Sequence, residues 1–269
     1  MEIREPAVAG MFYPGDAAGL RRQVEALIPR TESPVDALAI VAPHAGYVYS
    51  GACAGLAWSG LVPRDTIVIV GVNHRGIGAS LAVDAHAAWR TPLGETRVDL
   101  ELARALTDGS PLFSLDSRAG MHEHSLEVQV PFVQMAAPEA SILPITVGAV
   151  APEKIIEAGV MLAATIRSIR PNALLVASTD MSHYISAAAA ERMDRQAIER
   201  IMALDPSGLM RVVMIRHISM CGVAPTALVL KAAMERGASR VEEVCYTHSG
   251  AVTGDDSEVV AYWSGRILA

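Results

Sequence analysis

The sequence lacks several features that would assign it to a common class of protein. Its 269 residues include only three cysteines, Cys53, Cys221 and Cys245. This is too few for a disulfide framework, so we expect a protein of a reducing compartment, the cytoplasm. The charged residues ahead of Pro6 form no signal-peptide core, which favours the same compartment.

Positive charge is also scarce. Lysine occurs only at Lys154 and Lys231, arginine supplies nearly all the remaining positive charge, and the formal net charge is −7. No basic stripe is visible, which argues against a nucleic-acid-binding surface. The mean hydropathy is +0.31, but Arg211, Arg216 and Lys231 interrupt the most apolar stretches before the ~18 to 20 residues that a membrane-spanning helix requires. We therefore expect neither nucleic acid nor membrane as a partner.

The order of apolar segments predicts an α/β fold. Hydrophobic residues make up 51% of the chain and charged residues 19%, as in a well-packed globular protein. Strand-like and helix-like segments alternate, without a repeat or a linker, so we expect a single domain over residues 1–269. The two runs at 241–247 and 259–264 lack an obvious helix between them. We therefore predict a central mixed sheet, mostly parallel with an antiparallel edge, flanked by helices.

Three histidines follow predicted buried strands. Apolar runs predict these strands at residues 37–41, 66–72 and 173–177, and His44, His74 and His183 come shortly after them. In open α/β sheets, chemistry collects beyond the carboxyl ends of the strands. His44 and His74 are one β-α-β unit apart, so we expect them at neighbouring strand ends. A lone histidine is more often structural, but three in the same position favour a metal or acid–base centre.

Cys221 precedes a glycine at the expected start of a helix. The helix macrodipole favours a thiolate there, which makes Cys221 either a soft metal ligand or a nucleophile. The alternative is a small buried hydrophobe, the usual state of a free cysteine. We assign Cys53 and Cys245 to that class.

Asp180 and His183 stand three residues apart in one loop. If this loop begins a helical turn, both side chains face one crevice. A histidine near neutral pH can take a proton from a substrate, while an aspartate orients it. The alternative is that Asp180 only caps the local backbone.

His122, Glu123, His124 and Glu127 form a polar cluster ahead of an apolar run. A solvated helix start would explain it, because acidic side chains are favoured there. The alternative is that His124 and Glu127 support metal ligands from behind.

Ordered motifs along the chain resemble those of the Memo family (mediator of ErbB2-driven cell motility), in its bacterial and archaeal AmmeMemoRadiSam system protein B branch. They are Ala9-Gly10-Met11-Phe12-Tyr13-Pro14, Ala42-Pro43-His44-Ala45-Gly46-Tyr47, Asn73-His74, Arg90-Thr91-Pro92-Leu93, Glu123-His124-Ser125-Leu126-Glu127, Ser178-Thr179-Asp180-Met181-Ser182-His183 and Cys221-Gly222. They span essentially the whole chain.

The resemblance implies a fold similar to class III, LigB-type extradiol dioxygenases. It also implies His44, His74 and Cys221 as metal ligands, with Asp180 and His183 as the catalytic loop and His183 as the acid–base group. Those dioxygenases use a carboxylate where this chain offers Cys221. Thiolate softness favours Fe(II), copper or zinc over magnesium or calcium. Relatives tend to be encoded beside an AMMECR1-like protein and a radical S-adenosylmethionine protein, so we expect these as partners.

Three functions are compatible with this sequence. The first is a metal-dependent, dioxygenase-like oxidoreductase acting on an unknown small molecule or peptide. The second is a non-catalytic metal-containing adaptor that binds a peptide or protein. The third is nucleophilic catalysis by Cys221 with His183 as base, which would need no metal.

Overall fold

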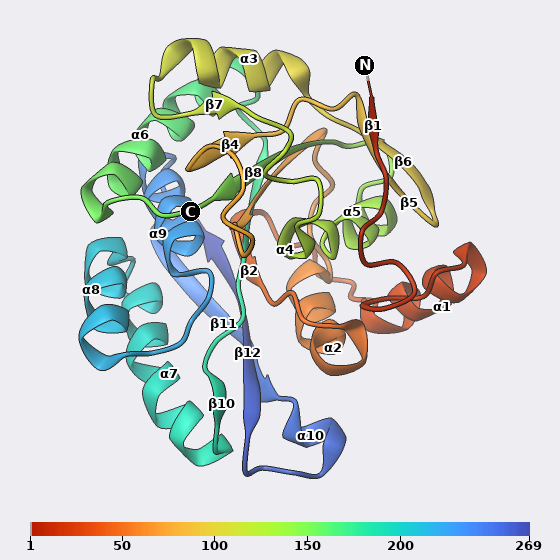
Figure 1. The fold of residues 1–269 in the computed structure, drawn as a ribbon, viewed down its shortest axis with the longest axis vertical. Helices are drawn as coiled ribbons and strands as arrows, with labels where there is room; N and C mark the ends of the chain where they lie inside the picture. Colours follow the sequence, from red (N-terminus) through yellow and green to blue (C-terminus); the bar gives the residue numbers. More distant parts are fainter. Residues whose placement is uncertain (1) are drawn as a thin grey trace.

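The computed structural model describes residues 2–269 and contains a large mixed sheet between two layers of helices (Figure 1). The sheet has nine strands in the order β10-β12-β2-β9-β3-β8-β4-β7, with β11 also paired to β12. The strands are β2 (Ala37–Ala42), β3 (Thr66–Val72), β4 (Leu81–Val83), β7 (Ser114–Leu115), β8 (Ser141–Val147), β9 (Leu174–Ser178), β10 (His183–Ile185), β11 (Arg240–His248) and β12 (Val259–Leu268).

The four central strands β2, β9, β3 and β8 are parallel to one another. Antiparallel pairs flank them on both sides, since β12 runs against β2 and β4 runs against β8. The predicted mixed sheet is therefore confirmed, but it has antiparallel strands on two sides instead of one. A second sheet, which the sequence did not predict, has three strands in the order β1 (Ile3–Arg4), β5 (Ala88–Thr91) and β6 (Gly94–Arg97).

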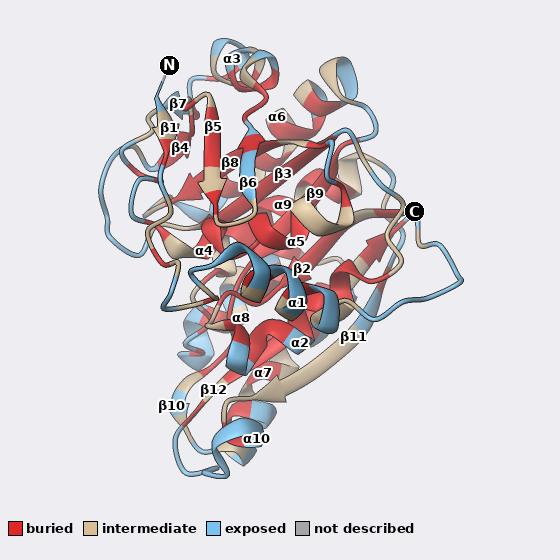
Figure 2. Ribbon diagram, turned by 90° about the vertical axis from the view of Figure 1, so that its right-hand side faces the viewer, coloured by how far each residue is buried: buried red, intermediate tan, exposed pale blue. Residues whose placement is uncertain are grey.

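The helices cover the two faces of the main sheet. They are α1 (Ala17–Leu27), α2 (Tyr47–Trp58), α3 (Leu100–Gly109), α4 (His124–Glu127), α5 (Val130–Ala136), α6 (Pro152–Ile169), α7 (Ala187–Met202), α8 (Pro206–Arg216), α9 (Val223–Glu235) and α10 (Gly250–Thr253). In Figure 1, α3, α6, α7, α8 and α9 lie on one side, and α1, α2, α4 and α5 lie on the other. Figure 2 shows that the central strands β2, β3, β8 and β9 are almost entirely buried.

Alternation along the central strands divides the core into two clusters. In β3, Val68 and Val70 contact the cluster under α6 and α9, whereas Ile67 and Ile69 contact the cluster under α2 and α5. A parallel strand covered on both faces needs apolar side chains at every position, which is why the run reads as continuous. Each such side chain stabilises the fold by about 1.5–3 kcal/mol when fully buried.

Aspartates mark the starts of three helices. Asp16, Asp99 and Asp205 each accept a hydrogen bond from a backbone N–H in the first turn, which satisfies a donor that has no partner within the helix. Pro225 lies in the first turn of α9, where it removes no helical hydrogen bond. Among the described residues, none of the helices is both long and apolar enough to span a membrane.

Candidate metal centre

The carboxyl ends of three adjacent parallel strands form the base of the candidate site. β2 leads to His44, β9 leads to Asp180, and β3 leads to His74. The sequence predicted that His44 and His74 follow neighbouring strands, and this is wrong because β9 lies between β2 and β3. Because β9 lies between β2 and β3, Asp180 also reaches this edge of the sheet, where its carboxylate accepts the backbone N–H of His44.

His44, His74 and Cys221 come together beyond these strand ends. Their nitrogen and sulfur atoms all lie within 4.8 Å of one another, although His44 and Cys221 are 177 residues apart. The Cys221 Sγ is 3.2 Å from the His44 Nε2, and the two imidazoles meet edge to face with their centroids 5.4 Å apart. This group could hold a metal ion.

Hydrogen bonds around Ser178 determine which nitrogen of His44 is free. The Ser178 hydroxyl donates to the Ser125 carbonyl at 2.5 Å and accepts from the Gln129 Nε2 at 3.1 Å. Its single proton is thus committed, so the His44 Nδ1, at 3.1 Å, must be the donor. The His44 Nε2 therefore carries a lone pair and points toward Cys221. Burial, with help from nearby His124 and His74, lowers the pKa of His44 well below its ordinary value, which keeps the ring neutral.

Glu123 fixes His74 in the same way. One carboxylate oxygen accepts from the His74 Nδ1 at 2.9 Å, and the other accepts from the His74 backbone N–H at 2.8 Å. Burial alone would raise the pKa of Glu123, but the hydrogen bonds from His74 and the Ser125 backbone hold it at about 2. A carboxylate behind a histidine is the usual support of a metal-ligating imidazole. The sequence pattern places Glu123 in the polar cluster of residues 122–127 but does not indicate this role.

In the polar cluster, Glu123 and Glu127 are buried and His124 is half-buried, whereas His122 is exposed. The interpretation as a solvated helix start is therefore wrong for the two carboxylates. His124 stacks on His74 with ring centroids 4.6 Å apart and meets His44 edge to face at 5.4 Å. Burial lowers the pKa of His124. A second group that could hold a metal consists of His74, Glu123 and His124, so His124 stands among the candidate ligands as well as behind them.

The sequence predicted that Glu127 supports the metal ligands from behind. Among the described residues, its carboxylate forms no hydrogen bond to His44, His74 or Cys221. Its carboxylate pairs with Arg4 at 2.6 Å and accepts hydrogen bonds from the Tyr13 hydroxyl and from the backbone N–H groups of Ala7 and Val8. Glu127 therefore holds the N-terminal segment. That segment includes Phe12, whose ring packs 4.9 Å from the ring of His124, so the support that Glu127 gives to the site is indirect.

Cys221 precedes Gly222, the residue before α9. A side chain at Gly222 would meet the Ser178 carbonyl oxygen at 2.7 Å, so only glycine lets this turn approach β9. The predicted stabilisation of a thiolate by the helix start is not found. Burial and the nearby Asp180 carboxylate raise the pKa of Cys221 to about 12, which disfavours a free thiolate nucleophile.

Asp180 and His183 both line one pocket, but not through a helical turn. Residues 179–182 are non-helical, and His183 begins β10. The Asp180 carboxylate accepts the His44 backbone N–H at 2.7 Å, so it links two strand ends instead of capping its own loop. Burial raises the pKa of Asp180. The His183 Nδ1 is 3.0 Å from the Ser219 carbonyl oxygen, which can only accept, so Nε2 of the neutral ring is unprotonated.

The pocket has a volume of about 390 Å³, and the described residues that line it include none of the three candidate ligands. It adjoins them through His124, which packs against the rings of His44 and His74. Asp180, His183 and His124 form its polar wall, and four aromatic rings form much of the rest. These rings belong to Phe12, Tyr49, Tyr184 and Tyr262. Such a pocket combines polar side chains next to the candidate ligands with an apolar rim that can hold an organic group.

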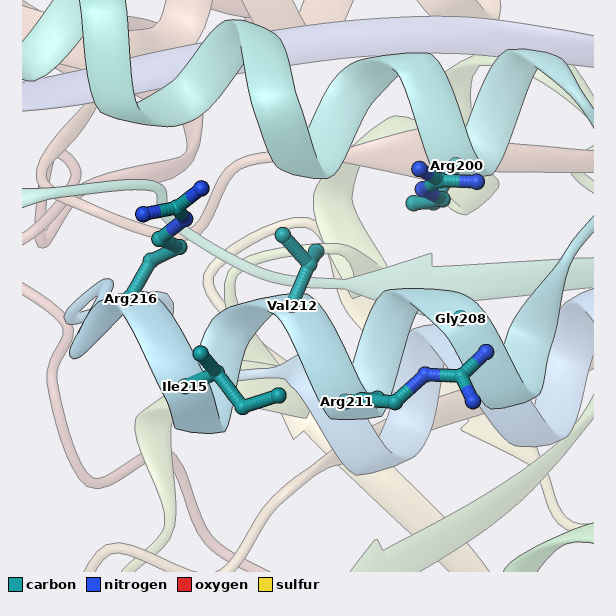
Figure 3. A pocket seen from close by; sticks show the side chains of 6 residues that line it. All are labelled: Arg200, Gly208, Arg211, Val212, Ile215 and Arg216. Carbon is teal, nitrogen blue, oxygen red and sulfur yellow. The ribbon is translucent and has the colours of Figure 1, made fainter.

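Another hollow, of about 350 Å³, lies between α7 and α8 (Figure 3). Arg200 projects from α7, and Arg211 and Arg216 project from α8, with Val212 and Ile215 between them. No histidine, cysteine or carboxylate is among the residues that line it. It therefore offers no acid–base or metal-ligating chemistry, and the strand-end pocket remains the candidate site.

Comparisons with known proteins agree with the motifs. Residues 4–266 match the family described as Memo-like protein. A MEMO1 family protein of Methanothermobacter thermautotrophicus is 40% identical over 272 residues, covering 97% of this chain and 98% of the relative. A MEMO1 family protein of Aquifex aeolicus is 38% identical over 264 residues, with coverages of 97% and 98%.

Among solved structures, an uncharacterized protein from Escherichia coli K12 has a similar fold. The TM-score is 0.53 at 17% sequence identity, and the alignment covers 75% of this chain and 87% of the other. This likeness concerns the fold alone. The sequence matches extend over almost the whole chain and include every candidate ligand, so the chain belongs to the Memo-like family.

Proposed function

We propose that this protein is a metal-dependent, dioxygenase-like oxidoreductase whose ion is held by His44, His74 and Cys221. One observation carries the proposal. Both imidazoles have their Nδ1 protons committed, to Ser178 and to Glu123, so that their Nε2 lone pairs and the Cys221 sulfur are available in one small space. A structural histidine needs no such control of its tautomer, whereas a metal ligand does.

The donor set fits a borderline or soft transition ion. Two neutral imidazoles and one sulfur suit Fe(II), copper or zinc, and three protein ligands leave room for further ligands, as in catalytic centres. We favour Fe(II), with copper or zinc as alternatives. When bound, such an ion would supply Lewis acidity and, for iron or copper, electron transfer to a substrate in the adjacent pocket.

The residues of the pocket can bind a substrate and move its proton. His183 faces the pocket with Nδ1–H held by the Ser219 carbonyl, so Nε2 can accept a proton from a hydroxyl or amide group of the substrate. Asp180 fixes the backbone of His44 and forms part of the same wall. The aromatic rim around Tyr49 and Tyr262 can exclude water from an organic substrate.

A second function is favoured by the width of this rim. Tyr184 has 75% of its surface exposed and Tyr49 41%, and both border the pocket. Exposed aromatic side chains around a recess are typical of protein and peptide recognition. In this alternative the metal centre is structural, and the pocket receives a side chain of a peptide without chemistry.

Metal analysis tests the first function directly. We would purify the protein without oxygen and measure bound metals by inductively coupled plasma mass spectrometry, with Cys221→Ser as the test variant and Cys245→Ser as the matched control. We expect about one iron or copper per chain, lost in Cys221→Ser and kept in Cys245→Ser. Dioxygen consumption with candidate substrates would follow.

Two results would contradict this function. If the protein binds no transition metal after reconstitution, the oxidoreductase proposal fails. If thiol alkylation abolishes an activity that removal of metal leaves unchanged, Cys221 acts as a nucleophile instead.

We also propose that the protein works in one pathway with an AMMECR1-like protein and a radical S-adenosylmethionine protein. The family membership supports this proposal. Co-expression followed by affinity purification, and assays of each partner's product as a substrate, would test it. If neither binding nor turnover is observed, the proposed pathway is wrong.

A further inference from the structure

Cys53 and Cys245, which play no part in the candidate metal centre, lie against each other where α2 packs on β11. The Cys53 Sγ is 3.8 Å from the backbone oxygen of Cys245 and 3.6 Å from the Ser264 hydroxyl. Ser264 is the cross-strand partner of Cys245 in the β11–β12 pair. Directly paired residues of an antiparallel pair project from the same face, so the Cys245 side chain also points toward α2.

The neighbouring thiols differ in acidity. The interaction between their side chains lowers the pKa of Cys245, whereas the same interaction and burial raise the pKa of Cys53. The pair therefore consists of one sulfur with increased thiolate character and one neutral thiol at its side. This asymmetry is typical of an attacking and a resolving cysteine.

Cys245 is also more accessible to solvent than Cys53. Cys53 is buried, whereas Cys245 is half-buried. β11 lies at the edge of the sheet, paired only with β12, and its register shifts between Glu243 and Cys245. Figure 2 shows β11 as a largely half-buried strand along the outside of the fold. A small oxidant from solvent therefore reaches Cys245 before Cys53.

We propose that Cys245 and Cys53 form a peroxide-reactive pair that closes to an intramolecular disulfide. The Cys245 thiolate attacks one peroxide oxygen, the O–O bond breaks, and a sulfenic acid forms on Cys245 while the other oxygen leaves as water or an alcohol after taking a proton. The Cys53 thiol then loses its proton and attacks the Cys245 sulfur. The S–S bond forms, the S–O bond breaks, and water leaves.

The peroxide accepts all the electrons that the two thiols lose. Two thiols lose two electrons and two protons, and one peroxide is reduced by two electrons. The reaction needs neither the metal centre nor Cys221. The disulfide would join α2 to β11. The first turn of α2 includes Tyr49 and β11 leads into Ser249, and both residues line the pocket, so oxidation would link two segments of its wall.

The test uses the full chain with Cys221→Ser, so that Cys53 and Cys245 are the remaining thiols and the metal centre is disabled. We would add hydrogen peroxide, count free thiols after denaturation, and map the products by mass spectrometry without reduction. We expect both thiols to disappear together, with the loss of two hydrogen atoms and a peptide that joins Cys53 to Cys245. Dithiothreitol should restore both thiols.

Single variants distinguish the attacking cysteine, Cys245, from the resolving cysteine, Cys53. In Cys53→Ser, the sulfenic acid on Cys245 has no resolving thiol, so a 1,3-dione probe should label it. In Cys245→Ser, Cys53 should stay reduced at the same peroxide concentration. The proposal is overturned if both thiols stay reduced while methionines oxidise, if Cys245 is labelled equally in the presence and absence of Cys53, or if the only disulfide formed joins two chains.

Discussion

Replacement of Glu123 by glutamine tests the control of the His74 tautomer. The carboxylate accepts three hydrogen bonds, from the His74 ring, the His74 backbone and the Ser125 backbone. Glutamine has nearly the same shape but only one acceptor oxygen, and its amide protons would face donors. The His74 ring and the His74 backbone N–H bind different oxygens of Glu123, so one glutamine oxygen cannot accept from both. Either the Nδ1 proton loses its acceptor or the backbone N–H of His74 faces an amide N–H, and both outcomes weaken the control of the His74 tautomer.

The magnitude follows from the environment of Glu123. Its pKa is about 2 compared with an ordinary 4.5, so its ionised form is stabilised in the fold by about 3 kcal/mol. Part of this free energy should be lost in the variant. Loss of a carboxylate behind a metal-ligating histidine typically weakens metal binding about 10- to 100-fold. We therefore expect Glu123→Gln to fold with reduced stability and to bind metal correspondingly more weakly.

Competition with a chromophoric chelator would measure the affinity, and urea unfolding of the metal-free protein would measure the stability. Glu157→Gln is the matched control, because Glu157 forms an exposed ion pair with Lys154. That change should leave metal affinity unchanged and stability within about 0.5 kcal/mol. If Glu123→Gln binds metal as tightly as the unchanged protein, the argument from the tautomer is refuted.

Three further changes test other parts of the site. Ser178→Ala removes the acceptor of the His44 Nδ1 proton, so metal affinity should fall about tenfold by calorimetry; an unchanged affinity would mean that Ser178 does not set the tautomer. The pKa of Glu123 is lowered on folding, so its contribution to stability is present above about pH 4.5 and is lost as pH falls through about 2. Urea midpoints of the metal-free protein should decline over that range, and less steeply in Glu123→Gln. Glu127→Ala leaves Arg4 buried without its partner and should cost about 3–5 kcal/mol of unfolding free energy, whereas a loss below about 1 kcal/mol would contradict this role.

The sequence predicted the parts of this site that local patterns determine. Buried parallel strands must be apolar throughout, so polar residues just beyond them stand out, and His44 and His74 are among these. The mixed sheet was also predictable, because α10 between β11 and β12 is too short for a parallel crossover. The same reasoning could not place β9 between β2 and β3, since strand order depends on the paths of the crossovers.

The role of Glu123 could not be predicted for a different reason. Acidic residues near a helix start are usually solvated, and periodicity gives no indication that this one is completely buried. Its burial depends on the contact between the 123–127 segment and the end of β3, where the Ser125 hydroxyl donates to the Val72 carbonyl. Glu127 was misplaced because its partners, Arg4 and Tyr13, lie more than 110 residues away in sequence.

The burial of Cys221 explains why a thiol suits this position only together with a cation. Burial and Asp180 raise its pKa to about 12, so the thiol stays protonated when it faces only protein groups. Burial keeps His44 neutral as well, while Glu123 stays ionised behind His74. The cluster thus has the negative charge of Glu123 behind metal-binding atoms that are themselves neutral. A bound divalent cation would make ionisation of the Cys221 sulfur favourable, because the thiolate and the cation neutralise each other. A half-buried thiol with so high a pKa is a poor free nucleophile and a good ligand, which is why the metal-centred function is favoured over catalysis by Cys221 alone.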